Sequence, residues 1–154
     1  MKFINRSQRT MLGVTLLEIM LVLAVAALIL VMSIKYYRTA TASKQANDSL
    51  SMIQAIVSMA DSVAMASGSY STGGLTTTAV QAMLPNNGVV PWSTDQVTVA
   101  ASAASYNVTL PAMPADVCPL VYSKLAGDPH YTPISPCTSS AANFTYTYNH
   151  TSGY

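Results

Sequence analysis

The sequence predicts an α+β protein in which one long N-terminal helix packs on a small antiparallel β-sheet. Neither glycine nor proline occurs in residues 14–67, so nothing in that stretch interrupts a helix. All eight prolines lie between Pro85 and Pro136, where the composition turns to Ser, Thr, Ala and Gly. Short runs of alternating polarity in this second half are typical of strands, at 96–99, 106–110 and 144–148.

The composition excludes an ordinary well-solvated cytosolic domain. Of the 154 residues, 51% are apolar and only 8% are charged, against about 25% charged in an average soluble protein. The net charge is +1, so the chain lacks the basic field that a nucleic-acid site needs. Residence in a membrane, burial in an assembly, or both would explain so few charges.

The first 34 residues resemble a membrane anchor behind a basic leader. Residues 1–13 contain basic and no acidic side chains. Residues 14–34 then form an apolar run of 21, in which only Thr15, Glu18 and Ser33 are polar. As a helix, this run is long enough to cross a hydrocarbon core of about 30 Å. The basic leader favours a cytoplasmic N-terminus.

Residues 35–67 are expected to continue the helix as an amphipathic half. They open with Lys, Tyr, Tyr and Arg at 35–38, as an interfacial belt would. Two apolar stripes follow at helical spacing, and Gly68 is expected to end the helix. The stripes either form one wide core face, or one packs on the chain's own domain and the other on neighbouring copies. The first stripe is Ala46, Leu50, Ile53, Val57, Ala60 and Ala64, and the second is Met52, Ile56, Met59 and Val63.

Residues 68–154 are expected to form the globular domain, with the antiparallel sheet lying against the helix. The Ser/Thr-rich stretch 67–78 predicts a linker or surface loop. Asn86, Asn87 and Gly88 predict a turn.

Glu18 is the informative residue of the anchor. An unpaired carboxylate in lipid is expensive, by at least about 2.5 kcal/mol for an acid at mid-helix. Glu18 therefore either lies hydrated at headgroup depth or gains a positive partner during assembly. No Lys or Arg lies within the apolar run, so the partner would come from elsewhere. An α-amino group exposed by cutting off the leader would serve.

The junction Gly13-Val14-Thr15-Leu16-Leu17-Glu18 resembles the class III signal sequence of type IV prepilins. The resemblance covers about the first third of the chain and implies a pilin-like fold. It implies that a prepilin peptidase cuts after Gly13 on the cytoplasmic side and methylates the new N-terminus, Val14. Glu18 is then the fifth mature residue, which the family pairs with the N-terminal amine of a neighbouring subunit. Valine as the first mature residue, the 13-residue leader and the absence of Pro or Gly in mid-anchor lean toward the type IVb branch.

A conventional secretory signal is the rival interpretation of this segment. Ala24-Val25-Ala26 satisfies a small-x-small cleavage pattern. Against it, the apolar run continues past that cut, through Met32, and Glu18 would interrupt the signal's core.

Cys118 and Cys137 are the only cysteines, and no metal-ligand set accompanies them. In the oxidising periplasm that the resemblance implies, a disulfide is expected between them. Type IV pilins are similar here, since their C-terminal disulfide-bounded region is commonly exposed and variable. The loop holds Tyr122, His130 and Tyr131, which either cover the sheet edge or contact a partner.

No catalytic constellation is evident, so we expect neither an enzyme nor a cofactor. A calcium site at Asp116 and Asp128 is conceivable, although a spaced motif is missing. His150 is expected to face solvent. The leading hypothesis is a structural subunit of a type IV pilus, anchored in the bacterial inner membrane and then assembled into an extracellular filament. Its partners would be copies of itself, the prepilin peptidase and the pilus assembly machinery.

Two other functions stay open. One is a minor pilin or a type II secretion pseudopilin, built in the same way. The other is a single-pass membrane protein whose exported domain binds a ligand, with Glu18 incidental.

Overall fold

A computed structural model describes residues 15–71, 74–138 and 140–150. The chain forms two compact units that divide after Arg38. The predicted cleavage residues Gly13 and Val14 lie outside the described residues. The first unit contains the apolar half of helix α1, and the second contains the rest of α1 with the sheet.

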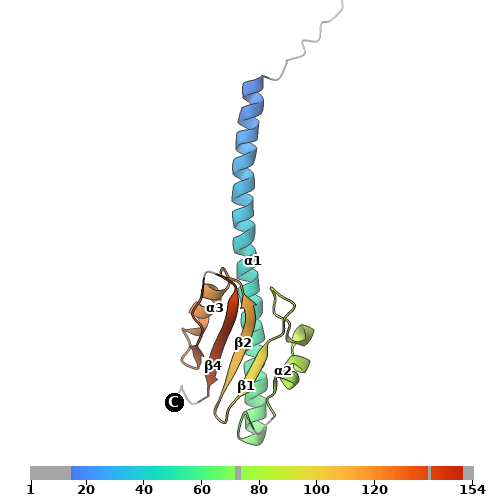
Figure 1. The fold of residues 1–154 in the computed structure, drawn as a ribbon, viewed down its shortest axis with the longest axis vertical. Coiled ribbons are helices and arrows are strands. Elements are labelled where there is room, and N and C mark those ends of the chain that lie inside the picture. The colour runs from blue at the N-terminus through green and yellow to red at the C-terminus, as the bar shows by residue number, and fades with distance from the viewer. Residues whose placement is uncertain (1–14, 72–73, 139, 151–154) are drawn as a thin grey trace, which may run out of the picture. The chain divides into compact units, whose positions relative to one another are not determined.

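Helix α1 runs from Leu16 to Ser67, 52 residues, and confirms the predicted long helix (Figure 1). Thr15 precedes it and caps it, because its side-chain oxygen accepts a hydrogen bond from the Glu18 N–H at 3.3 Å. Gly68 ends the helix as predicted. Its φ of 75° is the left-handed conformation that glycine adopts freely, and its N–H donates to the Ala64 carbonyl at 2.7 Å.

The second unit contains a four-stranded antiparallel sheet in the order β1-β2-β4-β3. Two predicted strands, 106–110 and 144–148, lie within β2 and β4, whereas the predicted 96–99 overlaps β1 only at its end. The three-residue β3, which ends at a proline, was not predicted. The strands are β1 Thr98–Ala101, β2 Ser105–Met113, β3 Tyr131–Pro133 and β4 Ala142–Asn149.

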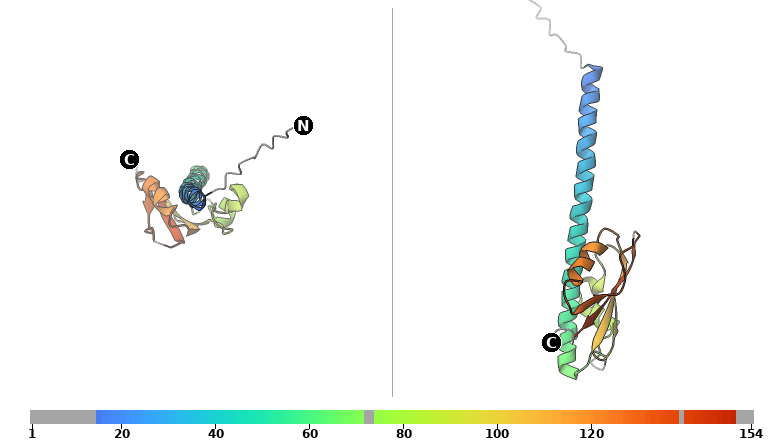
Figure 2. Two further views of the ribbon diagram at one scale, coloured as in Figure 1. Left: turned by 90° about the horizontal axis from the view of Figure 1, so that it is seen from above. Right: turned by 90° about the vertical axis from the view of Figure 1, so that its left-hand side faces the viewer.

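One face of the sheet packs along the second half of α1 (Figure 2). The buried positions of α1 recur at spacings of four and three, as one helical face requires. They include members of both predicted stripes, and the remaining stripe residues are half-buried against the same core. These buried positions are Ala42, Ala46, Ser49, Ile53, Ile56 and Ala60. The strands contribute Tyr106, Val108, Leu110, Phe144, Tyr146 and Tyr148.

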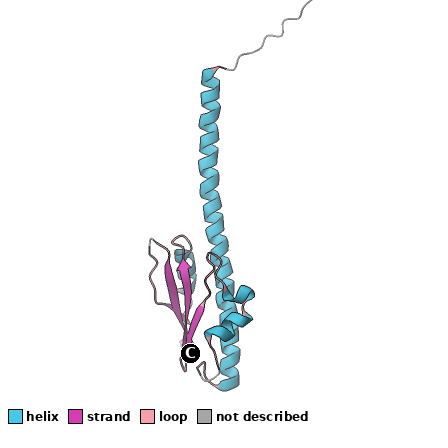
Figure 3. Cartoon of the chain, turned by 45° about the vertical axis from the view of Figure 1, so that its right-hand side comes forward, coloured by secondary structure: helices cyan, strands magenta, loops and turns pink. Residues whose placement is uncertain are grey.

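Two short helices flank the sheet (Figure 3). Helix α2, Thr77–Met83, contacts β1, and helix α3, Cys118–Leu125, contacts β3. The expectation of a loop through residue 78 is therefore wrong at its end. Thr76 caps α2 by accepting the Ala79 N–H at 3.2 Å, and Thr77 bonds to the backbone of Val99. Helices this short depend on such tertiary contacts more than on their own propensity.

The predicted turn at Asn86, Asn87 and Gly88 is confirmed. All three residues have positive φ, of 53°, 55° and 71°, within the 3₁₀ segment η1, Pro85–Gly88. A side chain on Gly88 would come within 2.9 Å of the Val97 side chain, so glycine is required there for space as well as for conformation.

Candidate functional site

The first half of α1 presents an uncovered apolar surface. Every residue from 15 to 40 is exposed. An 18-residue window of α1 reaches a mean hydropathy of 2.8, and none of it is buried. By length and composition this helix can cross a membrane, as a span or as a signal anchor. Apolar surface on this scale is costly in water, so lipid or protein must cover it.

The polar groups within this half are few and differ in their environment. Ser33 satisfies its hydroxyl locally, because it donates to the Ile29 carbonyl at 2.8 Å. Glu18 lies in the first turn, where the helix dipole favours a negative charge. The next charged residue along the helix is Lys35, 17 positions away, or about 25 Å at 1.5 Å per residue. No cation of the described part of α1 can therefore reach Glu18.

The segment 35–38 follows the apolar surface at once. Tyr36 and Tyr37 are 78% and 72% exposed, and Lys35 and Arg38 flank them. Amphipathic aromatic rings with basic neighbours are typical of the boundary between lipid and water.

The predicted disulfide between Cys118 and Cys137 is present, with the two Cα atoms 5.7 Å apart. It joins the first residue of α3 to the segment between β3 and β4. Cys118 is buried in the core, whereas Cys137 is exposed. The disulfide thus links the buried start of α3 to an exposed segment between β3 and β4.

His130 and Tyr131, two residues of the disulfide loop, pack against tyrosines of β4, and Tyr131 begins the edge strand β3. The His130 ring stacks on Tyr148 with centroids 5.8 Å apart, and its Nδ1 lies 3.2 Å from the Asn149 carbonyl. Tyr131 is half-buried and packs edge-on against Tyr146 and Tyr148. Tyr122, on α3, is 39% exposed.

The two aspartates of the conceivable calcium site are engaged locally or exposed. Asp128 accepts the His130 N–H at 2.9 Å, and Asp116 is exposed. Within the described residues, no group of three or more His, Cys, Asp or Glu side chains could hold a metal ion.

A tyrosine cluster that no pattern in the sequence predicted lies between the sheet and the end of α1. The Tyr70 ring packs edge-on against Tyr106, and Tyr106 stacks on Tyr148, both with centroids 5.1 Å apart. Burial is the largest cause that raises the pKa of all three phenols, and the Asp61 carboxylate adds to it. Burial also raises the pKa of Tyr131, to about 12. The phenols are therefore neutral at physiological pH and act as packing.

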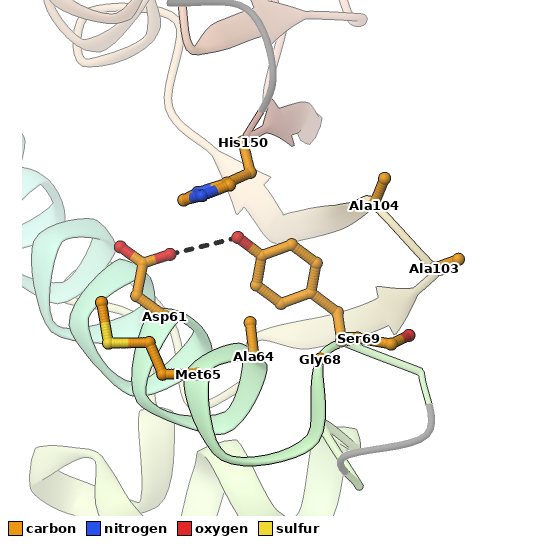
Figure 4. A pocket seen from close by; sticks show the side chains of 9 residues that line it. Asp61, Ala64, Met65, Gly68, Ser69, Ala103, Ala104 and His150 are labelled. Atoms are coloured by element: carbon orange, nitrogen blue, oxygen red, sulfur yellow. Dashed lines mark hydrogen bonds between the residues drawn. The ribbon is translucent and has the colours of Figure 1, made fainter.

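A cavity of about 330 Å³ opens at the end of α1, beside this cluster (Figure 4). The Asp61 carboxylate and the His150 ring face one another across it, and Tyr70 also lines it. Tyr70 donates a hydrogen bond to Asp61 Oδ1 at 3.1 Å. The other lining residues are small or apolar, among them Ala64, Met65, Gly68, Ala103 and Ala104. His150 is exposed, as expected, but borders this cavity.

Comparison with known proteins adds no relative to these observations. No protein-family model, no curated protein and no solved structure matches the chain.

Proposed function

We propose that this chain is a structural subunit of a type IV pilus, held in the bacterial inner membrane before it is assembled into an extracellular filament. The observation that carries the proposal is the uncovered apolar half of α1, which continues without a break into the core helix of a disulfide-bonded domain. The apolar surface of such a helix must be shielded from water both before and after assembly. Lipid shields it in the membrane, and the apolar helices of neighbouring copies shield it in the filament.

The energetics favour a filament core made of these helices. Apolar surface removed from water contributes about 25 cal/mol per Å². Extraction from the membrane loses lipid contacts, so the net gain from packing helix on helix is much smaller than that figure suggests. Assembly therefore depends on packing and on polar pairs, and on energy supplied by the assembly machinery.

Glu18 supplies the polar pair in this proposal. Cleavage after Gly13 removes the basic leader and creates an ammonium group at Val14, four residues before Glu18. In a bundle of staggered helices, that ammonium of one copy pairs with the Glu18 carboxylate of the next. The pair would neutralise a charge for which the described part of α1 offers no partner.

Mass spectrometry of the N-terminal peptide tests the proposal, on protein sheared from the cell surface. We expect an abundant peptide that begins at N-methylated Val14. A peptide that still carries residues 1–13 would contradict the cleavage and favour a single-pass membrane protein. Processed protein confined to the membrane fraction would instead identify a minor pilin or a pseudopilin.

A further inference from the structure

Two hollows lie at opposite ends of the second unit, one lined by an acidic residue and the other by a basic residue. The Asp61 cavity lies at the Gly68 end of α1. A shallower hollow lies between α1 and α3 at the other end, and Lys124 borders it. This hollow is lined by Ser43, Ala46, Asn47, Leu50, Leu120, Ser123 and Lys124.

Lys124 cannot reach Asp61 of its own chain. Lys124 lies at the level of residues 43–50 of α1, because it lines a hollow with them. Asp61 is 14 positions beyond Asn47, which places it about 21 Å further along the helix axis. That separation is far beyond the reach of a lysine side chain, so any contact between the two residues joins two copies.

Neither Asp61 nor Lys124 forms an ion pair with another described residue, although the His150 ring lines the same cavity as the Asp61 carboxylate. Asp61 Oδ1 accepts the Tyr70 hydroxyl, while Oδ2 accepts no hydrogen bond from the described part of the chain. Lys124 is exposed, and its ammonium forms neither an ion pair nor a hydrogen bond within those residues. The aliphatic and thioether groups of Ala64 and Met65 line the cavity beside the carboxylate. A lysine suits this site, since its apolar stem can lie on such a wall while its ammonium meets the acid.

We propose that Lys124 of one copy inserts into the Asp61 cavity of a second copy, so that the domains meet head to tail. The inference rests on the proposed pilus function and names a contact within that filament. A contact between two different surfaces is heterologous, and it repeats without limit unless a ring closes. Contacts between globular domains would thus stabilise the filament in addition to the packing of the apolar helices.

Zero-length carbodiimide cross-linking of sheared filaments tests the contact directly. The reagent joins a carboxylate to an amine as an amide only when the two groups touch. We expect a ladder of covalent oligomers on a denaturing gel, with an Asp61–Lys124 peptide pair identified by mass spectrometry. A ladder in which Asp61 is joined to Lys35 or Lys44 instead, or is not joined at all, would overturn the proposal.

Charge reversal tests the same contact in cells. Asp61→Lys and Lys124→Glu should each lower filament yield by about tenfold or more, because like charges then meet at the interface. The double variant should recover most of the yield. Asp116→Lys, an equal charge reversal at an exposed acid outside both hollows, should leave the yield near that of the wild type. Normal yield from both single variants would refute the contact.

A further pair of variants separates the contact from folding. Asp61→Asn keeps an oxygen for the Tyr70 hydroxyl but removes the charge, whereas Tyr70→Phe removes the hydrogen bond but keeps the charge. We expect Asp61→Asn to lower filament yield while the amount of processed subunit in the membrane stays at the wild-type level. Tyr70→Phe, which loses the hydrogen bond and some stability, should instead lower subunit amount and filament yield in the same proportion. If Asp61→Asn also lowers both in the same proportion, Asp61 has a purely structural role and the contact is overturned.

These results remain separable from the proposed function. If wild-type protein occurs only in the membrane fraction, the pilus proposal fails. The same carbodiimide reaction on that fraction then decides whether Asp61 and Lys124 of two copies meet there, and absence of that link would overturn the contact as well.

Discussion

The Tyr70 hydroxyl donates a hydrogen bond to Asp61 Oδ1, and this bond ties the loop after α1 to the last turns of the helix. Tyr70 is 2% exposed, so its ring is part of the core while its hydroxyl reaches the cavity. The donor belongs to a buried ring, and the acceptor belongs to the helix. The bond therefore restrains the direction in which the chain leaves α1.

Replacing Tyr70 with phenylalanine should lower the free energy of unfolding by about 1.5 kcal/mol, the lower limit for a hydrogen bond to a charged group, since solvent reaches the site. Denaturant unfolding of the full-length protein in detergent, followed by Trp92 fluorescence, measures it. Trp92 reports the fold because its indole N–H donates to the Pro111 carbonyl at 2.8 Å. Tyr122→Phe, on an exposed ring, is the matched control and should change nothing. An equal loss in both variants would show that the Tyr70–Asp61 bond contributes no specific stability.

Tyr146 should respond in the opposite way. Its hydroxyl is buried and has no hydrogen-bond partner among the described residues, and the same holds for Tyr106. A buried unpaired hydroxyl costs about 1–3 kcal/mol. Tyr146→Phe should therefore leave the free energy of unfolding unchanged or raise it, in the same denaturation experiment. A decrease of 1 kcal/mol or more would mean that an ordered water bonds this hydroxyl.

The long helix could be predicted from the sequence because its signals are local. An absence of Gly and Pro from 14 to 67 and a glycine at 68 mark it with no knowledge of the rest of the chain. The strands β2 and β4 were found for the same reason, since each alternates buried and less buried residues over several positions.

The elements that were missed depend on contacts distant in sequence. Helix α2 is held by Thr77, which bonds to Val99, and β3 has only three residues, paired with β4. The cavity could not be predicted for the same reason. Asp61 and His150 both line it although 89 positions separate them, and no spacing rule joins an acid in a helix to a histidine after the last strand.

Loss of the disulfide should destabilise the globular domain. Cys118 and Cys137 are 19 positions apart, and a loop of that size is worth about 3 kcal/mol in the chain-entropy model. Cys118→Ala with Cys137→Ser should lower the free energy of unfolding by about that amount, while it keeps an apolar group at the buried position. Subunit abundance in the periplasmic and membrane fractions gives the readout in cells.

Two comparisons separate the effect of losing the disulfide from the effect of the substituted side chains. The wild type treated with a reductant should match the double variant in denaturation. Cys118→Ser with Cys137→Ser should be less stable than the alanine version, because it places a hydroxyl in the core. Unchanged abundance and stability in the double variant would show that the domain does not depend on the disulfide.

Alkali should unfold the domain through the tyrosine cluster. Burial raises the pKa of Tyr70, Tyr106, Tyr131, Tyr146 and Tyr148, so the folded state holds these protons above pH 10 while the unfolded state releases them. The stabilisation is complete below the ordinary tyrosine pKa of about 10. It is lost as the pH rises through the raised pKa values, among them that of Tyr131 at about 12.

Tyrosinate absorbance and circular dichroism, recorded together against pH, measure this effect. The tyrosines with a raised pKa should ionise above pH 10 and together with unfolding. They are Tyr70, Tyr106, Tyr131, Tyr146 and Tyr148. A single smooth titration near pH 10 with the fold retained would contradict the burial of the cluster.

Glu18→Val should leave membrane insertion intact and impair filament assembly. The substitution removes the one acidic residue of the apolar half, so insertion becomes easier. In the filament, however, the ammonium at Val14 of the neighbouring copy would be left without its counter-charge, and a buried unpaired charge costs several kcal/mol. Sheared filament and membrane-bound subunit, quantified by immunoblot, separate the two effects. Glu18→Asp keeps the charge on a shorter side chain and should retain more assembly than Glu18→Val.

Ser33→Val is the matched control, because Ser33 already satisfies its hydroxyl within the helix, and it should assemble normally. If Glu18→Val cells yield as much filament as the wild type, Glu18 does not pair with the amine, and its charge has to be accommodated by hydration at the membrane surface.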